Sequence, residues 1–281
     1  CVFVLKSIID YYIKLSTPLY LCFIDASKAF DRVEHCTLFQ KLLKRQLPKV
    51  IILFIYQWYS TQHFIIKWGE TLSVPFTVTN GVRQGGVLSP ALFNVYIDDL
   101  SESLSKTNVG CNMNGVTMNH LVYADDTVLL ATSPTALQKL LNCCEEYADS
   151  HDIIYNVTKT YCMCIKPKCF KNLTVPDVFL NGRILKYIPV QKYLGCVISN
   201  NFKDDLDIER QIRYVYRTGN SLVRNFKLCS DEVKFQLFKT LCSNFYCCQL
   251  WSKRSEEHTS ELQSLTNLVC RIMREKGGGG G

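Results

Sequence analysis

The sequence predicts an α+β fold. Helical and strand-like segments alternate irregularly along the 281 residues, unlike the regular alternation of a doubly wound parallel sheet. Apolar residues make up 47 % of the chain, including 15 Phe and 15 Tyr, so the chain can bury a substantial core. The length allows one large domain or two small ones.

Apolar spacing and turn residues locate the individual elements. We expect helices over residues 2–14, 36–60, 89–104, 136–149 and most of 204–250. We expect strands over 19–24, 160–165 and 193–198, a hairpin over 63–78, a loop over 81–86, and a strand–turn–strand over 121–131. Pro18 ends the first helix and Pro48 interrupts the second, because proline removes a backbone donor and disfavours a helical residue before it.

The charge favours a polyanionic partner without identifying one. The net charge is +7, and basic and acidic residues cancel over 254–281, so the whole surplus lies on residues 1–253. The 15 cysteines are odd in number and lack C-x-x-C spacing, which argues against a disulfide framework or a zinc site. We expect small core thiols in a reducing compartment.

No membrane partner is expected. The sequence shows no signal peptide, and its longest apolar run, residues 50–56, is far shorter than the ~20 residues that cross a bilayer. We therefore expect an intracellular protein, in the cytoplasm or nucleus. Neither a methionine nor a capping residue precedes the helix expected over 2–14, which indicates a fragment.

Two adjacent carboxylates, Asp125 and Asp126, lie between two apolar strands. Like charges so close repel and raise each other's pKa unless a cation is bound. A solvated hairpin turn is the alternative, because Asp is common in turns. The pair by itself does not decide between them.

A third carboxylate, Asp25, follows the apolar strand at 19–24. If the two elements are neighbours in one sheet, three carboxylates converge on an oxygen-rich site that suits Mg²⁺. A second acidic pair, Asp98 and Asp99, falls within the helix expected over 89–104, and we interpret it as part of a solvated face.

Three segments are similar to motifs of the reverse transcriptases of non-LTR (LINE-type) retrotransposons. They are FIDASKAFD at 23–31, GVRQGGVLSPALFN at 81–94 and YADD at 123–126. Two weaker segments, NVTKT at 156–160 and YLG at 193–195, follow in the family's order. A lone YADD is weakly specific, whereas five segments in order over roughly residues 1–250 are strongly so.

The resemblance implies a reverse-transcriptase palm, an antiparallel sheet with helices on one face, together with partial fingers and the start of a helical thumb. Residues 1–17 would be a remnant of the entry helix from the fingers to the palm, 18–190 the palm with inserted partial fingers, and 191–253 the primer-grip hairpin and partial thumb. Residues 254–281 are similar to a translated sequencing adapter followed by glycines, and we expect a non-native tail there. A polar helix with a flexible tail is the alternative.

The resemblance also implies catalytic roles by position. Asp25 and Asp125 would be the principal metal ligands and Asp126 would support them. Lys159 would protonate the leaving pyrophosphate, although an ordinary surface lysine explains it nearly as well.

Further positions would bind substrate. Phe30 would clash with a ribose 2′-hydroxyl and so select deoxynucleotides, with a core aromatic as the alternative role. Gln84 and Gly85 would contact the template and the incoming nucleotide, and the glycine would let the backbone approach the substrate closely. A simple strand-to-helix turn is the alternative. The primer terminus would be held by Tyr193, Leu194 and Gly195.

The implied reaction adds a dNTP to the 3′-hydroxyl of a DNA primer on an RNA template. It would use two Mg²⁺ ions, or Mn²⁺ in their place. Basic residues at 41–49 and 203–227 would grip phosphates without reading sequence.

Two other hypotheses stand beside this one. The family's earlier fingers motifs would lie before residue 1, so the chain could be a catalytically inert truncated copy that keeps only the palm fold and nucleic-acid binding. A group II intron maturase, which shares the palm, is the third.

Overall fold

The computed structural model describes residues 1–170, 174–242 and 246–251, so the tail expected at 254–281 lies outside the described residues. The chain divides into two compact units. The first comprises Cys1 and Asp10–Tyr187, and the second comprises Val2–Ile9 and the chain from Ile188 onward. Helix α1 (Val2–Lys14) contributes to both. None of the helices in the described ranges has the length and apolarity that crossing a bilayer requires.

A five-stranded sheet, ordered β13-β10-β1-β9-β8, forms the centre of the first unit. Its strands are β1 (Leu19–Ile24), β8 (His120–Tyr123), β9 (Asp126–Ala131), β10 (Tyr161–Ile165) and β13 (Lys186–Tyr187). Neighbouring strands are antiparallel except β10 and β13. Strand β1 lies in the middle and is buried along its whole length, as its uninterrupted apolar sequence predicted.

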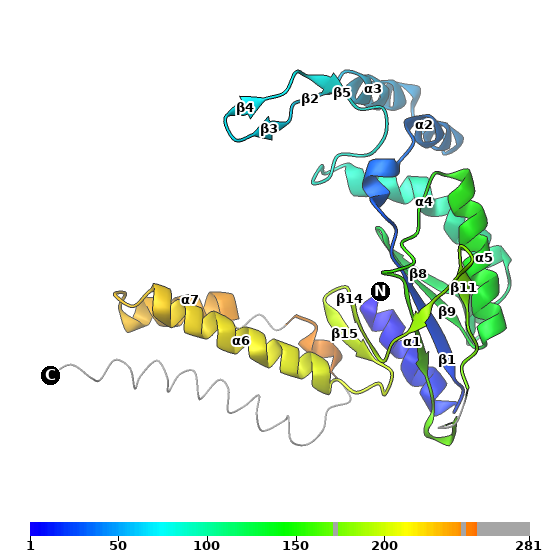
Figure 1. Ribbon diagram of the computed structural model, residues 1–281, viewed down its shortest axis with the longest axis vertical. Coiled ribbons are helices and arrows are strands. Elements are labelled where there is room, and N and C mark those ends of the chain that lie inside the picture. Colours follow the sequence, from blue (N-terminus) through cyan, green and yellow to red (C-terminus); the bar gives the residue numbers. More distant parts are fainter. Residues whose placement is uncertain (171–173, 243–245, 252–281) are drawn as a thin grey trace. The chain divides into compact units, whose positions relative to one another are not determined.

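Helices α4 (Ser89–Lys106) and α5 (Pro134–Ser150) belong to the layer beside this sheet (Figure 1). Tyr20, Cys22 and Ile24 are alternate residues of β1 and share the face that packs in this core. The other members include Leu100, Leu104, Leu129, Ala131, Leu137, Leu140, Leu141 and Cys144. Helix α5 begins where Ser133 Oγ accepts a hydrogen bond from the Ala136 amide at 3.2 Å, a standard N-cap.

A second cluster joins α4 to the segments that follow β1. These are the 3₁₀ turn η1 (Ala29–Arg32) and helices α2 (His35–Lys44) and α3 (Lys49–Ser60). The buried members of this cluster include Val33, Leu38, Leu42, Ile52, Ile55, Phe93 and Tyr96. Pro48 caps α3, so the interruption predicted there is confirmed.

Beyond α3 the chain forms an extended arm, which we define as residues 62–80 (Figure 1). It contains the short strands β2 (His63–Phe64), β3 (Lys67–Trp68), β4 (Thr71–Leu72) and β5 (Phe76–Thr77). Strand β2 pairs with β5 and β3 pairs with β4. Most of the arm is exposed to solvent.

Lys41 connects α2 to both α4 and α5 from a buried position. Its ammonium donates hydrogen bonds to the carbonyl of Tyr96 and, at 2.9 Å, to the hydroxyl of Tyr147. It also pairs with Asp99 at 3.1 Å, while desolvation lowers the pKa of Lys41 against the opposing pull of that carboxylate. The expectation that the basic stretch at 41–49 grips phosphates is therefore wrong for Lys41.

The second unit contains a hairpin and two longer helices. The hairpin is β14 (Val190–Tyr193) and β15 (Cys196–Ser199); the helices are α6 (Asp205–Asn225) and α7 (Asp231–Cys242), followed by the 3₁₀ turn η3 (Cys248–Leu250). Val215 and Leu222 pack with Phe238 between the two helices.

Buried Asp207 ties parts of the second unit together. One carboxylate oxygen accepts from the Val197 amide at 3.0 Å and from Arg210, and the other accepts from the Trp251 indole at 2.9 Å. Hydrogen bonds to a carboxylate are stronger than neutral ones, so this residue holds the hairpin against the helix that follows it.

The elements that the sequence missed are short. They are η1, β6 (Cys111–Met113), β7 (Val116–Met118), β11 (Phe179–Leu180), β12 (Arg183–Ile184), β13 and the 3₁₀ turn η2 (Lys168–Phe170). Two or three residues carry too little periodicity to predict a strand. The single strand expected over 193–198 is instead the end of β14, a turn and most of β15, because the chain reverses with positive φ angles of 44° at Leu194 and 81° at Gly195. Every described cysteine is free and most are buried, as expected for core thiols.

Candidate active site

Two of the predicted carboxylates meet across neighbouring strands of the sheet. Asp25 follows the last residue of β1, and Asp126 is the first residue of β9. The two strands are antiparallel, with Ile24 paired to Thr127, so Asp25 and Asp126 occupy the next positions of the same ladder. Asp125 precedes Asp126 in the turn between β8 and β9.

This proximity is visible in the electrostatics. Partial burial of its carboxyl raises the pKa of Asp126, and the negative charges of Asp125 and Asp25 raise it further. Deprotonation of Asp126 therefore costs more than it would for an isolated aspartate. A cation bound at this end of the sheet would offset that repulsion.

The turn that carries the carboxylates is tight. Tyr123 pairs with Asp126, which leaves only Ala124 and Asp125 between the strands. Ala124 has a φ of 53°, a left-handed conformation that residues with a Cβ adopt at a cost. Sequence reasoning placed the acidic pair at this turn, and the structure confirms that position.

A segment before β10 brackets the backbone of Asp25 on both sides. The Asn156 amide donates to the Asp25 carbonyl at 2.8 Å, and the Asp25 amide donates to the Thr160 hydroxyl at 3.2 Å. The Ser27 amide donates to the Ile154 carbonyl at 2.8 Å. Thr160 is completely buried. These contacts fix the end of β1, and sequence reasoning missed the positioning roles of Asn156 and Thr160.

The NVTKT segment at 156–160 contains both residues of this bracket, but the resemblance assigned a role only to Lys159. That residue is exposed in the turn just before β10, and its amide donates to the Asn156 carbonyl at 3.1 Å. Its proposed role with pyrophosphate stays a prediction.

Phe30 belongs to the core next to η1. Its ring stacks on that of Phe93, with centroids 4.6 Å apart and planes 16° apart. It packs against the buried cluster of α2, α3 and α4. The core role is therefore present, and the discrimination against a 2′-hydroxyl stays a prediction.

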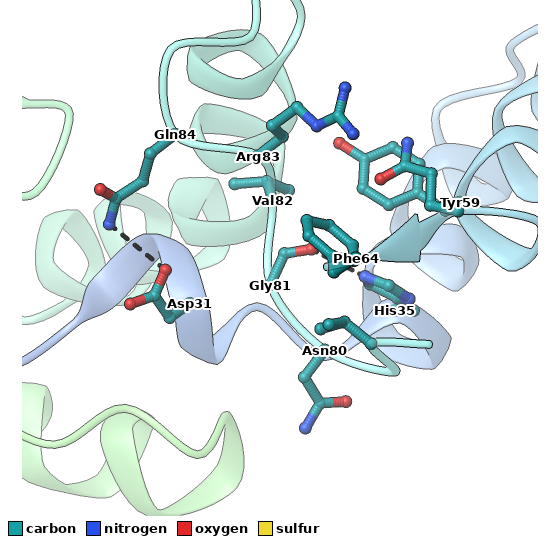
Figure 2. Close-up of a pocket in the computed structure, with 11 residues that line it drawn as sticks. Asp31, His35, Tyr59, Phe64, Asn80, Gly81, Val82, Arg83 and Gln84 are labelled. Carbon is teal, nitrogen blue, oxygen red and sulfur yellow. Dashed lines mark hydrogen bonds between the residues drawn. The ribbon is translucent and has the colours of Figure 1, made fainter. Parts of the chain in front are cut away.

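Gln84 and Gly85 lie in the loop before α4, and both are exposed. Figure 2 shows the Gln84 amide donating to Asp31 Oδ1, a bond of 3.2 Å. Gly85 has a φ of 80°, and a Cβ added there would have no heavy atom within 4 Å. The backbone conformation favours glycine, and the space beside it is open to a ligand.

The second acidic pair has structural partners. Asp99 pairs with Lys41, and Asp98 pairs with Arg45. Both aspartates are exposed on α4, as the solvated-face interpretation predicted. The residues expected to hold the primer, Tyr193 to Gly195, form the tight turn of the β14–β15 hairpin in the second unit, and their role stays a prediction.

Comparison with known proteins establishes the family. The family model "Reverse transcriptase (RNA-dependent DNA polymerase)" matches residues 5–198. The chain belongs to this family. The predicted resemblance to the reverse transcriptase domain of non-LTR elements is confirmed, since the curated relatives come from such elements.

One relative is the "RNA-directed DNA polymerase from mobile element jockey" of Drosophila melanogaster, 26 % identical over 89 % of this chain and 28 % of its own length. Another is the Pol polyprotein of the "type-2 retrotransposable element R2DM" of the same fly, 29 % identical over 63 % of this chain and 17 % of its own. The chain thus spans less than a third of the length of each of these relatives.

Among solved structures, telomerase from Candida tropicalis in complex with a telomeric RNA fragment matches with a TM-score of 0.53. The match covers 97 % of this chain and 45 % of that one at 12 % identity. A likeness at this identity concerns the fold alone, and the predicted α+β palm-like fold is confirmed.

Proposed function

We propose that this chain carries the polymerising centre of an RNA-directed DNA polymerase from a non-LTR retrotransposon. It would add a dNTP to the 3′-hydroxyl of a DNA primer paired with an RNA template. The observation that carries the proposal is the placement of Asp25 and Asp126 on adjacent strands with Asp125 in the tight turn beside them. The free thiols of the described cysteines fit a reducing, intracellular compartment.

The carboxylates suit a divalent cation whose coordination the substrate completes. Across the described residues, no three His, Cys, Asp or Glu side chains are gathered closely enough to hold a metal ion by themselves. Mg²⁺ is commonly bound by one or two carboxylates plus water and substrate phosphates, so a complete protein cage is not required. The mutual repulsion at Asp126 supports cation binding at Asp25, Asp125 and Asp126.

Two Mg²⁺ ions, or Mn²⁺ in their place, would stabilise charge on the attacking and leaving oxygens. The protein's own contribution is positioning. Asn156 and Thr160 hold the Asp25 backbone, and Gly85 opens the loop to substrate. Lys159 would offset charge on the released pyrophosphate.

The substrate-selecting residues follow the same logic. Phe30 is held by its stacking on Phe93, so it has little freedom to move aside for a 2′-hydroxyl. Gln84 would contact the template and nucleotide from the exposed loop. Tyr193, Leu194 and Gly195 would hold the primer terminus.

A catalytically inert copy that only binds nucleic acid is the second candidate, and the net charge of +7 is the observation that favours binding by itself. Primer extension on an RNA template with Mg²⁺ separates the two, with binding of the same hybrid measured in parallel. Primer extension that is lost in Asp125→Asn but kept in Asp98→Asn would support polymerisation. Binding without extension would support the inert copy, and extension that survives Asp125→Asn would overturn the catalytic assignment.

A further inference from the structure

A pocket of ≈ 470 Å³ lies beside the loop that carries Gln84 (Figure 2). Its lining comes from η1, α2, α3, the arm and residues 80–84. The volume falls within the range of about 300–1,000 Å³ that is usual for small-molecule sites. None of the catalytic carboxylates predicted from the sequence lines it.

Three rings contribute to the pocket wall: Tyr59, Phe64 and His35. Burial raises the pKa of Tyr59, so its phenol stays neutral. The guanidinium of Arg83 lies over the ring of Phe64, 5.7 Å from its centroid. Such flat faces are the surfaces on which single-stranded bases stack.

The polar part of the lining is rich in amides and nearly neutral in charge. Gln62, Asn80 and Gln84 each offer a donor and an acceptor. The single arginine, Arg83, is offset by the single carboxylate, Asp31, which accepts from Gln84. A site for a triphosphate would need an excess of cations, whereas a neutral, amide-bearing lining suits an uncharged heterocycle.

The loop that forms one side of the pocket is held in place before any ligand binds. The Gly81 amide donates to the Val33 carbonyl at 2.7 Å, and its own carbonyl lies 2.8 Å from His35 Nε2. The Val82 amide donates to the Phe30 carbonyl at 2.7 Å. A Cβ on Gly81 would lie 2.8 Å from the Asp31 carbonyl oxygen, so glycine permits this close approach.

We infer that this pocket receives one unpaired base of the RNA template, turned out of the strand ahead of the copying position. The inference rests on the proposed function and deepens it by naming a place for the template. The base would lie between the ring of Phe64 and the rings of Tyr59 and His35. Its edge would face Asn80 and Gln62. Gln84, at the boundary of the pocket, would lie between this base and the copied one.

The test uses 2-aminopurine, a fluorescent base whose emission falls on stacking. It is placed singly at the first, second or third unpaired position of an RNA template annealed to a DNA primer. Anisotropy of a dye on the primer measures hybrid binding separately. We expect the emission to change at one position only.

Two tryptophan variants of the arm provide the matched comparison. Val78 lines the pocket, so Val78→Trp should fill it and abolish the emission change. Val74 is 81 % exposed and lies outside the lining, so Val74→Trp should leave the change intact. Phe64→Leu keeps an apolar residue but removes the ring. The unpaired part of the template should increase the affinity for the hybrid, and in this variant that increase should be roughly tenfold smaller.

The outcomes separate the inference from the proposed function. A hybrid that binds with no position-specific change, or a change equal in Val78→Trp and Val74→Trp, would overturn the pocket assignment and leave polymerisation standing. Failure to bind the hybrid at all would overturn both.

Discussion

The carboxylate end of the sheet and the arm differ in how firmly the surrounding structure holds them. At the sheet end, β1 is buried on both faces and the backbone of Asp25 is bonded from two sides by the segment at 156–160. The arm consists of two-residue strands, and Trp68 near its tip is 85 % exposed. Chemistry on a phosphate requires fixed geometry, whereas contact with a flexible strand benefits from accessible rings.

The sharpest contrast concerns Asp25. Asp25→Asn keeps the size of the side chain but removes its charge, and we expect nucleotide addition to fall about a thousandfold, the scale of losing one pre-organised electrostatic contact. Primer extension in Mg²⁺ measures this. Asp98→Asn is the matched control, since Asp98 pairs with Arg45 on exposed α4. Equal activities of the two variants would contradict the assignment.

Buried Lys41 joins α2 to α4 and α5. Lys41→Met removes the ammonium from Tyr96, Tyr147 and Asp99, and should lower the free energy of unfolding by about 2–3 kcal/mol. The loss is moderated because Asp99 remains half exposed to water. Urea denaturation measures it. Lys44→Met, an exposed position on the same helix, should change stability by less than about 0.5 kcal/mol.

Thr160 tests the bracket around Asp25. Thr160→Val leaves the Asp25 amide without its acceptor and should cost about 1–2 kcal/mol in unfolding free energy. It should also reduce nucleotide addition, because the end of β1 loses its fixed position. Thr160→Ser keeps the hydroxyl and should restore activity. A valine variant with unchanged activity would show that the bracket serves stability alone.

Unlike the substitutions above, removal of the Asp126 charge is expected to stabilise the protein, and the gain should depend on pH. Its folded-state pKa is raised above 3.8, so its contribution to stability is present below that pH and is lost as the pH rises through the folded-state pKa. Asp126→Asn should therefore raise the melting temperature at neutral pH without Mg²⁺. The difference from wild type should vanish at acidic pH. Thermal unfolding at several pH values measures it, and a lower melting temperature for the variant at neutral pH would contradict the repulsion.

The smallest effect belongs to the arm's tip. Trp68→Ala should change the free energy of unfolding by less than about 0.5 kcal/mol, because so exposed a ring buries little area on folding. Denaturation midpoints compared with wild type measure this. A loss above 1 kcal/mol would show that the arm packs more firmly than its exposure indicates.

Much of this molecule was predictable where a pattern is long or chemically distinctive. The six apolar residues of β1 and the helical spacing of α5 identify these elements, because burial imposes a periodicity on sequence. The YADD turn was found because two adjacent carboxylates between apolar strands are costly. The domain boundaries at 17, 190 and 253 and the site roles remain predictions.

Residue patterns alone indicate the order of the main elements, the positions of the three carboxylates and the resemblance to reverse transcriptases. The folded arrangement determines what surrounds these features. It brought the Thr160 hydroxyl to the amide of Asp25 across 135 residues, drew Lys41 into the interior, and assembled a pocket from segments between Asp31 and Gln84. Local periodicity records which face of an element is buried, but not which distant segment covers it, because that choice depends on packing throughout the chain.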